Sequence, residues 1–259
     1  MQAETRSALR TLNRRFYQRF ADAFSDSRGR PWPGWKRVVD HLAETSPSSV
    51  LDAGCGNGRF AHFLARRLTP GWHYVGLDSC RELLDIAARR LEGVAPADFE
   101  AFDLLNDDLG RHLSGRHFDL VALFGVLHHV PGSGARRALL ASLTQHLRPG
   151  GLLAVSIWRF DRSPRFERRR IAWDDYNALC QRAGRPPLPI EQLEPGDVLL
   201  SWAGDREHPR YCHFPADDEI TDWIASSPVP LLDRFEADGP SGVDNLYLLF
   251  RKPLSAEDL

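Results

Sequence analysis

A glycine-rich segment with a leading carboxylate is the part of this sequence best suited to binding a ligand. Residues 52–58 read Asp-Ala-Gly-Cys-Gly-Asn-Gly and follow the apolar run at 48–51. Glycines let a backbone approach a ligand closely and adopt φ angles that a side chain forbids. The spacing is G-x-G-x-G, unlike the G-x-G-x-x-G of dinucleotide sites, and Asp52 suits a cationic amino group better than a pyrophosphate. A tight strand-to-helix turn without a ligand is the competing interpretation.

Two further carboxylates follow apolar segments in the same way. Asp78 and Asp103 each end a short run of apolar residues. An acid at the tip of the second strand can accept hydrogen bonds from both ribose hydroxyls of a nucleoside cofactor, and Asp103 could accept the adenine amino group. The alternatives are a solvated loop position for Asp78 and, for the adenine role, the neighbouring Asp107 or Asp108.

The expected order of elements explains how these acids would meet. We expect strands at 48–51, 73–77, 98–102, 118–124 and 152–158, and helices at 59–68, 81–91 and 134–147. Strands that alternate with helices pair in parallel through right-handed crossovers, so their carboxyl ends share one edge of the sheet. The predicted fold is α/β, a Rossmann-like doubly wound and mostly parallel sheet.

Outside this core the sequence predicts a helical extension and a closing hairpin. We expect helices at 6–24, 35–43, 166–183 and 217–225, a proline-rich loop at 185–189, and an antiparallel strand at 246–250 on the edge of the sheet. The predicted organisation has three parts: an N-terminal helical extension or cap at 1–44, a cofactor-binding Rossmann-like core at 45–160, and a substrate-side insertion with C-terminal strands that complete the sheet at 161–259.

Composition narrows the class of protein. Hydrophobic residues make up 42% of the 259 residues, enough for a sizeable core, and no apolar run reaches the ~20 residues of a membrane span. The first residues lack the pattern of a secretory signal, so we expect a cytoplasmic protein. The cysteines contain no C-x-x-C pair, which argues against a disulfide framework and a structural zinc site; no metal is predicted. They are Cys55, Cys80, Cys180 and Cys212.

Charge is distributed unevenly along the chain. The net charge of -2 speaks against nucleic acid, yet eight arginines fall within residues 6–37 and six within 159–170. Both clusters lie outside the predicted core, and there the arginines could contact the phosphate backbone of a nucleic acid. The alternative is a high general usage of arginine on solvated faces.

The core motifs resemble a known series. Residues 52–58, Asp78 and Asp103, together with 118–121 and 147–151, look like the motifs of class I S-adenosylmethionine-dependent methyltransferases. The resemblance implies S-adenosyl-L-methionine as the cofactor, with Asp78 on the ribose and Asp103 facing the adenine. It assigns the methionine end to Asp52, Gly54, Gly56 and Gly58. The neighbouring positions Cys55, Ser79, Leu104 and Phe124 complete the expected cofactor site.

The flanking segments carry a narrower resemblance. Residues 24–33, 126–130, 136–137, 196–202 and 210–214 are similar to the tRNA wobble-uridine carboxymethyl methyltransferases, which esterify a carboxymethyl group on uridine 34. The tRNA anticodon loop is therefore the expected partner. Because eukaryotic members of that family work with a small zinc-containing activator protein, such a protein is a second candidate partner.

Esterifying a carboxylate calls for positioning more than for a base. A carboxyl group with a pKa of roughly 4 is already ionised at pH 7, and an arginine orients it best through a planar fork. Arg28 and Arg210 are the candidates, or else surface arginines paired with nearby acids. His128 and His129 either contact the substrate or are satisfied structural histidines; we include His128 among the catalytic candidates.

Four further residues form the expected substrate site. Trp32 and Trp202 either stack on a base or belong to the core, and Asp197 and His213 lie in the flanking motifs. The sequence therefore predicts an S-adenosylmethionine-dependent methyltransferase acting on a carboxymethyl-type wobble uridine in tRNA. The alternatives are a small-molecule O- or N-methyltransferase and a non-catalytic adapter.

Overall fold

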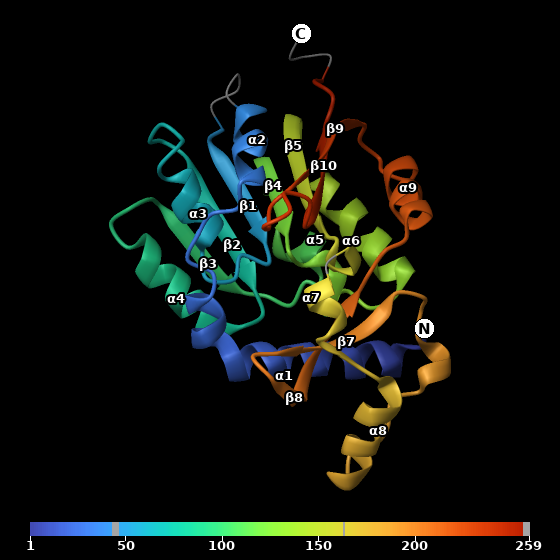
Figure 1. The fold of residues 1–259 in the computed structure, drawn as a ribbon. Helices are drawn as coiled ribbons and strands as arrows, with labels where there is room; N and C mark the ends of the chain where they lie inside the picture. Colours follow the sequence, from blue (N-terminus) through green and yellow to red (C-terminus); the bar gives the residue numbers. More distant parts are fainter. Residues whose placement is uncertain (43–46, 163, 256–259) are drawn as a thin grey trace.

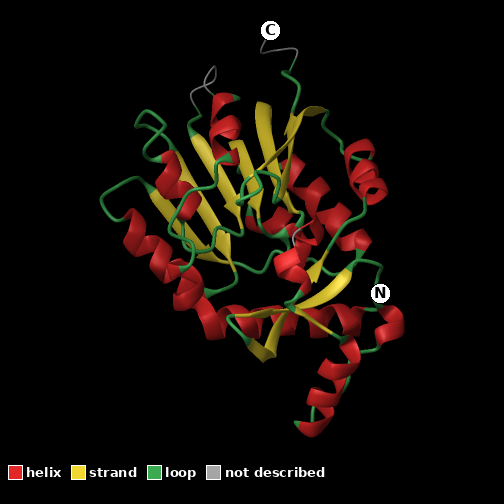
Figure 2. Cartoon of the chain, in the orientation of Figure 1, coloured by secondary structure: helices red, strands yellow, loops and turns green. Residues whose placement is uncertain are grey.

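A seven-stranded sheet forms the centre of the structure, in the order β3-β2-β1-β4-β5-β10-β9 (Figures 1 and 2). The computed structural model describes residues 1–42, 47–162 and 164–255. The strands are β1 Ser49–Ala53, β2 His73–Asp78, β3 Ala97–Ala101, β4 Phe118–Phe124, β5 Leu147–Trp158, β9 Leu231–Ala237 and β10 Asn245–Arg251. The first five pair in parallel, and β10 pairs antiparallel with β5 and β9. The predicted fold class, with its antiparallel edge, is confirmed.

Helices cover both faces of this sheet because side chains alternate along each strand. One face packs Leu51 and Val75 against helices α5 Leu109–His112, α6 Ser133–Gln145 and α9 Asp217–Ala225. The other packs Val50 and Tyr74 against α2 Gly34–Asp40, α3 Arg59–Leu64 and α4 Arg81–Leu91. Adjacent residues of one strand thus serve different cores.

A second, three-stranded antiparallel sheet lies beside the first and was not predicted. It consists of β6 Arg170–Ile171, β7 Asp197–Trp202 and β8 Asp205–His213, in the order β6-β7-β8. Helix α1 Ala3–Asp26 packs along it, with Leu9 and Leu12 against Leu199 and Tyr211. In Figure 1 this helix crosses the end of the main sheet where strands β1 to β4 finish.

The continuous helix expected at 166–183 is wrong. A short helix, α7 Pro164–Glu167, is followed by β6 and then by α8 Trp173–Arg182. Arg170 and Ile171 instead pair with Leu200 and Leu199 of β7. The pairing buries Ile171 in a core shared with α1, and this tertiary contact outweighs the local helical pattern.

Smaller departures concern element ends. The helix expected at 59–68 stops at Leu64, after which Arg66 and Arg67 donate backbone hydrogen bonds three residues back, as in a 3₁₀ turn. The expected end of the second helix at Ala43 and the expected domain boundary at 44/45 lie outside the described residues. Among the helices that the structure describes, none is long and apolar enough to cross a membrane.

Candidate active site

A cleft of about 670 Å³ opens at the carboxyl ends of β1 to β4 and beneath α1. Its volume falls in the range of small-molecule sites. It brings together most of the predicted site residues from far-separated parts of the chain. On the cofactor side these are Asp52, Gly54, Cys55, Gly56, Asp78, Ser79, Asp103, Leu104 and Phe124, and on the substrate side Arg28, Trp32, His128, Trp202 and Arg210.

The three glycines of the loop at residues 52–58 have different structural roles. Gly54, Gly56 and Gly58 all have positive φ, at 87°, 53° and 69°. A Cβ at Gly54 would lie 2.2 Å from Val126, whereas one at Gly56 would meet no described atom within 4 Å. Gly58 lies outside the described lining, and its Cβ would lie 2.9 Å from Ala87 of α4. Gly56 therefore keeps the floor of the cleft open, while Gly58 lets α3 and α4 pack closely.

Asp52 is buried at the start of this loop, with 2% of its surface exposed. Its Oδ2 accepts a 2.5 Å hydrogen bond from the hydroxyl of Tyr74, and its Oδ1 is buried without a partner among the described residues. Burial raises the pKa of Asp52 to about 7. A carboxylate in this state is suited to a cationic ligand group, so the residue fits the ammonium of a bound amino acid moiety.

Asp78 has a carboxylate of fixed orientation. Its Oδ2 accepts from the backbone N–H of Gly56 and its Oδ1 from that of Cys80, both at 2.9 Å. Burial raises its pKa, although the backbone hydrogen bonds oppose this shift. The remaining lone pairs of a carboxylate held this way can accept two ribose hydroxyls.

Asp103 holds the loop after β3. Its Oδ1 accepts from the backbone N–H of Leu105 at 3.0 Å. The two alternatives have structural contacts of their own: Asp107 accepts from the N–H of Asp103, and Asp108 caps α5 by accepting from Arg111. Asp103 is in the described lining of the cleft, whereas Asp107 and Asp108 are not, which favours Asp103 for an adenine.

Arg210 projects into the cleft from β8 and is only 3% exposed. Its guanidinium lies over the rings of Phe16, at 5.4 Å, and Trp158, at 5.0 Å. Within the described part of the chain no carboxylate lies within 4 Å of it, and its Nε is buried without a hydrogen-bond partner. Arg28, from the loop after α1, lies over Phe24 at 4.8 Å and also lines the cleft.

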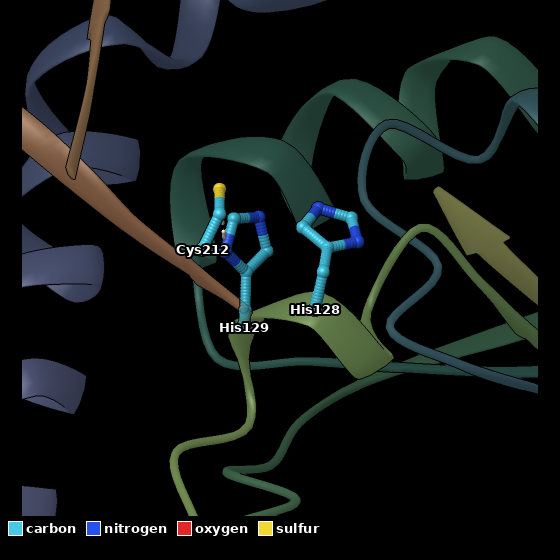
Figure 3. Close-up of side chains that lie close together, drawn as sticks. All are labelled: His128, His129 and Cys212. Atoms are coloured by element: carbon cyan, nitrogen blue, oxygen red, sulfur yellow. Dashed lines mark hydrogen bonds between the residues drawn. The ribbon is translucent and has the colours of Figure 1, made fainter. Parts of the chain in front are cut away.

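Two histidines of the 3₁₀ turn η1 Leu127–His129 lie beside Cys212 of β8 (Figure 3). His129 is held through both ring nitrogens, with Tyr17 Oη 2.7 Å from Nε2 and Tyr211 O 2.8 Å from Nδ1. Burial lowers the pKa of His128 far below its usual value and that of His129 to about 3, and Arg210 adds to both shifts. Both imidazoles are therefore neutral near pH 7, with a proton on one ring nitrogen each.

The same trio has the composition of a metal site but the wrong surroundings. Ligand atoms of His128, His129 and Cys212 lie within 4.8 Å of one another. However, both ring nitrogens of His129 already make hydrogen bonds, and the positive charges of Arg28 and Arg210 face His128. A bound cation would be repelled there, so we assign no metal to this cluster.

The tryptophans line the cleft at different depths. Trp202 packs against Phe16, Phe20 and Phe24 of α1, with ring centroids 5.2 to 6.4 Å away. Trp32 lies 5.4 Å from Trp35 and beneath the guanidinium of Arg59. Both are partly exposed, so each has a ring surface available to a planar ligand.

Sequence reasoning placed Asp197 and His213 in the substrate site, but the described lining of the cleft does not include them. They lie in a buried network behind β8. Conversely, it missed the contribution of α1, which lines the cleft with Ser7, Arg10, Thr11, Asn13, Arg14 and Tyr17. Several of these residues are three or four positions apart, and this spacing marks one face of a helix. The sequence could therefore have predicted that this face of α1 lies against a site.

Comparisons with known proteins match this chain to a methyltransferase family and to methyltransferase folds. Residues 51–153 match the model of the family described as "Methyltransferase domain". The structure is similar to an S-adenosylmethionine-dependent methyltransferase of Methanosarcina mazei, with a TM-score of 0.61 and 18% identity over 87% of this chain and 99% of that one. It is also similar to the N-methyltransferase NodS of Bradyrhizobium japonicum with S-adenosyl-L-homocysteine, with a TM-score of 0.53 and 20% identity over 96% and 98% of the two chains. These likenesses concern the fold.

Residues 51–153 thus match a methyltransferase domain, and the fold and the cleft make the chain similar to the class I S-adenosylmethionine-dependent methyltransferases. Within this class it resembles "Probable tRNA methyltransferase 9B" of human, with 30% identity over 74% of this chain and 38% of the relative. It also resembles "tRNA (carboxymethyluridine(34)-5-O)-methyltransferase ALKBH8" of mouse, with 29% identity over 70% and 26% of the two chains. The chain thus spans well under half the length of these curated relatives.

Proposed function

We propose that this chain transfers a methyl group from S-adenosylmethionine to a carboxylate on a modified wobble uridine of tRNA, giving a methyl ester. The observation that carries the proposal is Arg210, a buried guanidinium in the cleft without a carboxylate partner among the described residues. A buried charge is unfavourable unless it is paired, so an anionic acceptor would supply the missing partner. Relatives named tRNA (carboxymethyluridine(34)-5-O)-methyltransferase support the same kind of acceptor.

The residues of the cofactor side fit the cofactor. Asp52 Oδ1 lacks a partner in the described chain and would accept from an ammonium, while the fixed carboxylate of Asp78 would accept from ribose hydroxyls. S-adenosylmethionine supplies an electrophilic methyl group on a sulfonium when bound. In the transfer the carboxylate oxygen forms a bond to the methyl carbon as the carbon–sulfur bond breaks, and no proton moves.

The protein's contribution to this reaction is placement. Arg210 and Arg28 would hold the acceptor oxygen in line with the methyl group, which can supply much of the rate acceleration. The neutral state of His128 and His129 is consistent with this, because an ionised carboxylate needs no general base. Their rings, which pack together with Trp158, would limit the access of water to the acceptor side.

The surroundings of the cleft suit a tRNA acceptor. Arg10, Arg14 and Arg169 are among its lining residues and could meet phosphates, and Trp32 and Trp202 could stack on bases. For such a substrate the cytoplasm is the expected place of action.

Mass spectrometry of nucleosides tests the proposal. Bulk tRNA from cells lacking this enzyme would be incubated with the protein and S-adenosylmethionine, and reactions without protein and with S-adenosylhomocysteine in place of S-adenosylmethionine serve as the inactive controls. We expect a carboxymethylated uridine to be converted to its methyl ester only in the complete reaction. Turnover confined to small hydroxyl or amine compounds would replace the proposal with a small-molecule methyltransferase. A requirement for cell extract would indicate an activator protein.

A further inference from the structure

A buried network of charged side chains lies behind β8, away from the cofactor. His213 is 1% exposed, with its Nδ1 2.7 Å from Asp197 Oδ1 and its Nε2 2.9 Å from Glu219 Oε2. Arg136, also 1% exposed, donates to Glu219 at 2.9 Å and to Glu194 at 2.6 Å. These residues, hereafter the buried network, join β7 and β8 to α6 and α9 of the main fold.

Tyr211 connects the buried network to the backbone of β8. Its hydroxyl donates to Asp197 Oδ1 at 2.7 Å. Its backbone N–H donates to Asn13 Oδ1 of α1 at 2.7 Å, and its carbonyl lies 2.8 Å from His129 Nδ1. Because β8 is the last strand of its sheet, side chains from α1 and η1 complete the pairing that another strand would provide.

The alternation of side chains along β8 links this network to the cleft. Tyr211 and His213 point to the network, whereas Arg210 lines the cleft and Cys212 lies 3.9 Å from His129. A slip of one residue in a strand exchanges its two faces. The register of β8 therefore decides whether a guanidinium enters the cleft.

We propose that Asp197 and His213 are positioning residues that hold β8 in register and so fix the guanidinium of Arg210 at the acceptor end of the cleft. Only one test of this proposal, the measurement of turnover, depends on the proposed function. The two residues do not touch acceptor or cofactor; they act through Tyr211 and the strand.

The pairing of His213 requires its protonated form, because only the imidazolium donates from both nitrogens to two carboxylates. Burial opposes that form, but the hydrogen bonds to Asp197 and Glu219 outweigh it and raise the pKa of His213 above its usual value. The charged groups around it are Asp197 on β7, Glu219 on α9, Arg136 on α6 and Glu194 in the loop before β7. The positioning should therefore weaken as pH rises through the pKa of His213.

Asp197→Asn and His213→Gln test the proposal, with Asp119→Asn as the matched control. Asp119 accepts hydrogen bonds from Ser48 and Ser49 at the amino end of the sheet, far from β8. We expect hydrogen exchange in residues 205–214 to quicken at least tenfold in the two network variants and to stay unchanged in the control. Affinity for S-adenosylhomocysteine should stay within twofold of wild type in all three. Tyr211→Phe, which removes one hydroxyl, serves if a network variant does not fold.

Turnover separates positioning from general stability. In the network variants KM for the acceptor should rise at least tenfold. We also expect the KM of the wild type to rise with pH, and this rise should vanish in His213→Gln. Unchanged exchange in 205–214, or exchange that quickens while KM and its pH profile stay as in the wild type, would overturn the proposal. Exchange and cofactor binding need no acceptor, so these two measurements stand even where tRNA proves to be the wrong substrate.

Discussion

At the scale of single residues, the half-satisfied carboxylate of Asp52 predicts a pH-dependent cofactor affinity. Its Oδ1 lacks a partner in the described chain, and burial raises its pKa to about 7. A ligand ammonium favours the ionised form, so binding below that pH must release a proton. Affinity for S-adenosylhomocysteine should rise with pH up to about 7, and fall again only at alkaline pH, where the ligand's own amino group loses its proton.

Asp52→Asn tests this dependence directly. The amide can still accept from Tyr74 but cannot ionise, so affinity should fall at least tenfold at pH 7.5 and lose its rise between pH 5.5 and 7. Calorimetry at four pH values measures both effects. The same rise persisting in Asp52→Asn would show that another group is responsible.

Asp78 should contribute through its fixed orientation. Asp78→Ala removes the acceptor for two ribose hydroxyls, and charge-assisted hydrogen bonds are worth ~1.5–3 kcal/mol each. Micromolar affinity for the cofactor should therefore weaken at least tenfold. Asp98→Ala is the control, because Asp98 is an exposed acid that pairs only with His73 among the described residues. Calorimetry that finds equal affinity in Asp78→Ala and wild type would remove Asp78 from the site.

The two arginines of the acceptor side should affect turnover without affecting cofactor binding. Arg28→Lys and Arg210→Lys each keep a positive charge but lose the planar fork. Losing one charge-assisted hydrogen bond of ~1.5–3 kcal/mol at the transition state lowers turnover by one to two orders of magnitude. Single-turnover rates on the ester-forming reaction measure this. Near wild-type rates in both variants would assign the orienting role to other donors.

Residues at strand ends were predictable, whereas residues that meet through tertiary packing were not. Asp52, Asp78 and Asp103 were found because each ends an apolar run, and parallel strands bring such ends together. Tyr17 and Asn13 are equally close to the acceptor side, but their partners lie about a hundred or more positions away, at His129 and Tyr211. Nothing in the local sequence indicates those partners.

At the scale of elements, the parallel core was predictable because apolar strands and amphipathic helices alternate along the sequence. Strands β1 to β5 alternate with helices, and burial on both faces gives β1, β2 and β4 nearly continuous apolar runs, whereas the edge strand β3 is only partly buried. The small sheet gave weaker signals. Strand β6 has two residues, and its pairing with β7 depends on a contact across about thirty intervening positions. Such pairing is decided by the tertiary core under α1.

His129 in the turn η1 should make the stability of the folded protein depend on pH. His129 has a pKa of about 3 in the folded protein because of burial and Arg210, so below about pH 6.5 the unfolded chain takes up a proton that the folded chain excludes. Its contribution to stability therefore falls as pH drops, by about 1.4 kcal/mol between pH 7.5 and 5.5. His213, whose pKa is raised, has the opposite sign and loses its contribution as pH rises.

Urea unfolding at pH 5.5 and 7.5 measures this difference. In His129→Gln, which retains an amide for Tyr17 or Tyr211 but does not titrate, the loss of stability on acidification should be smaller than in the wild type by about that amount. An unchanged loss in the variant would mean that His129 takes up a proton equally in the folded and the unfolded chain, so that acid would place a further positive charge on the acceptor side.

At the scale of the whole molecule, the N-terminal helix and the C-terminal half of the chain close over one edge of the sheet. Helix α1 packs on β8 and near α4 (Figure 1). Side chains of α1 line the cleft that also contains the residues of the cofactor side. Arginines from α1, together with Arg169, line the mouth that results. A polyanionic substrate would therefore approach this one end of the molecule.

This arrangement predicts salt-dependent tRNA binding through the mouth. Arg168, Arg169 and Arg170 are exposed beside it, and each phosphate contact contributes roughly 0.7–0.9 to the slope of log affinity against log salt. Changing all three to glutamate should flatten that slope and weaken binding more at low salt than at high salt.

A second triple variant serves as the control. Changing Arg66, Arg67 and Arg148, exposed at the amino end of the sheet, alters the net charge equally but should leave the slope within error of wild type. Filter binding from 50 to 300 mM salt compares the two triple variants. Equal flattening in both would mean that the overall charge of the molecule attracts tRNA, and a salt-independent or undetectable interaction would favour a small-molecule acceptor.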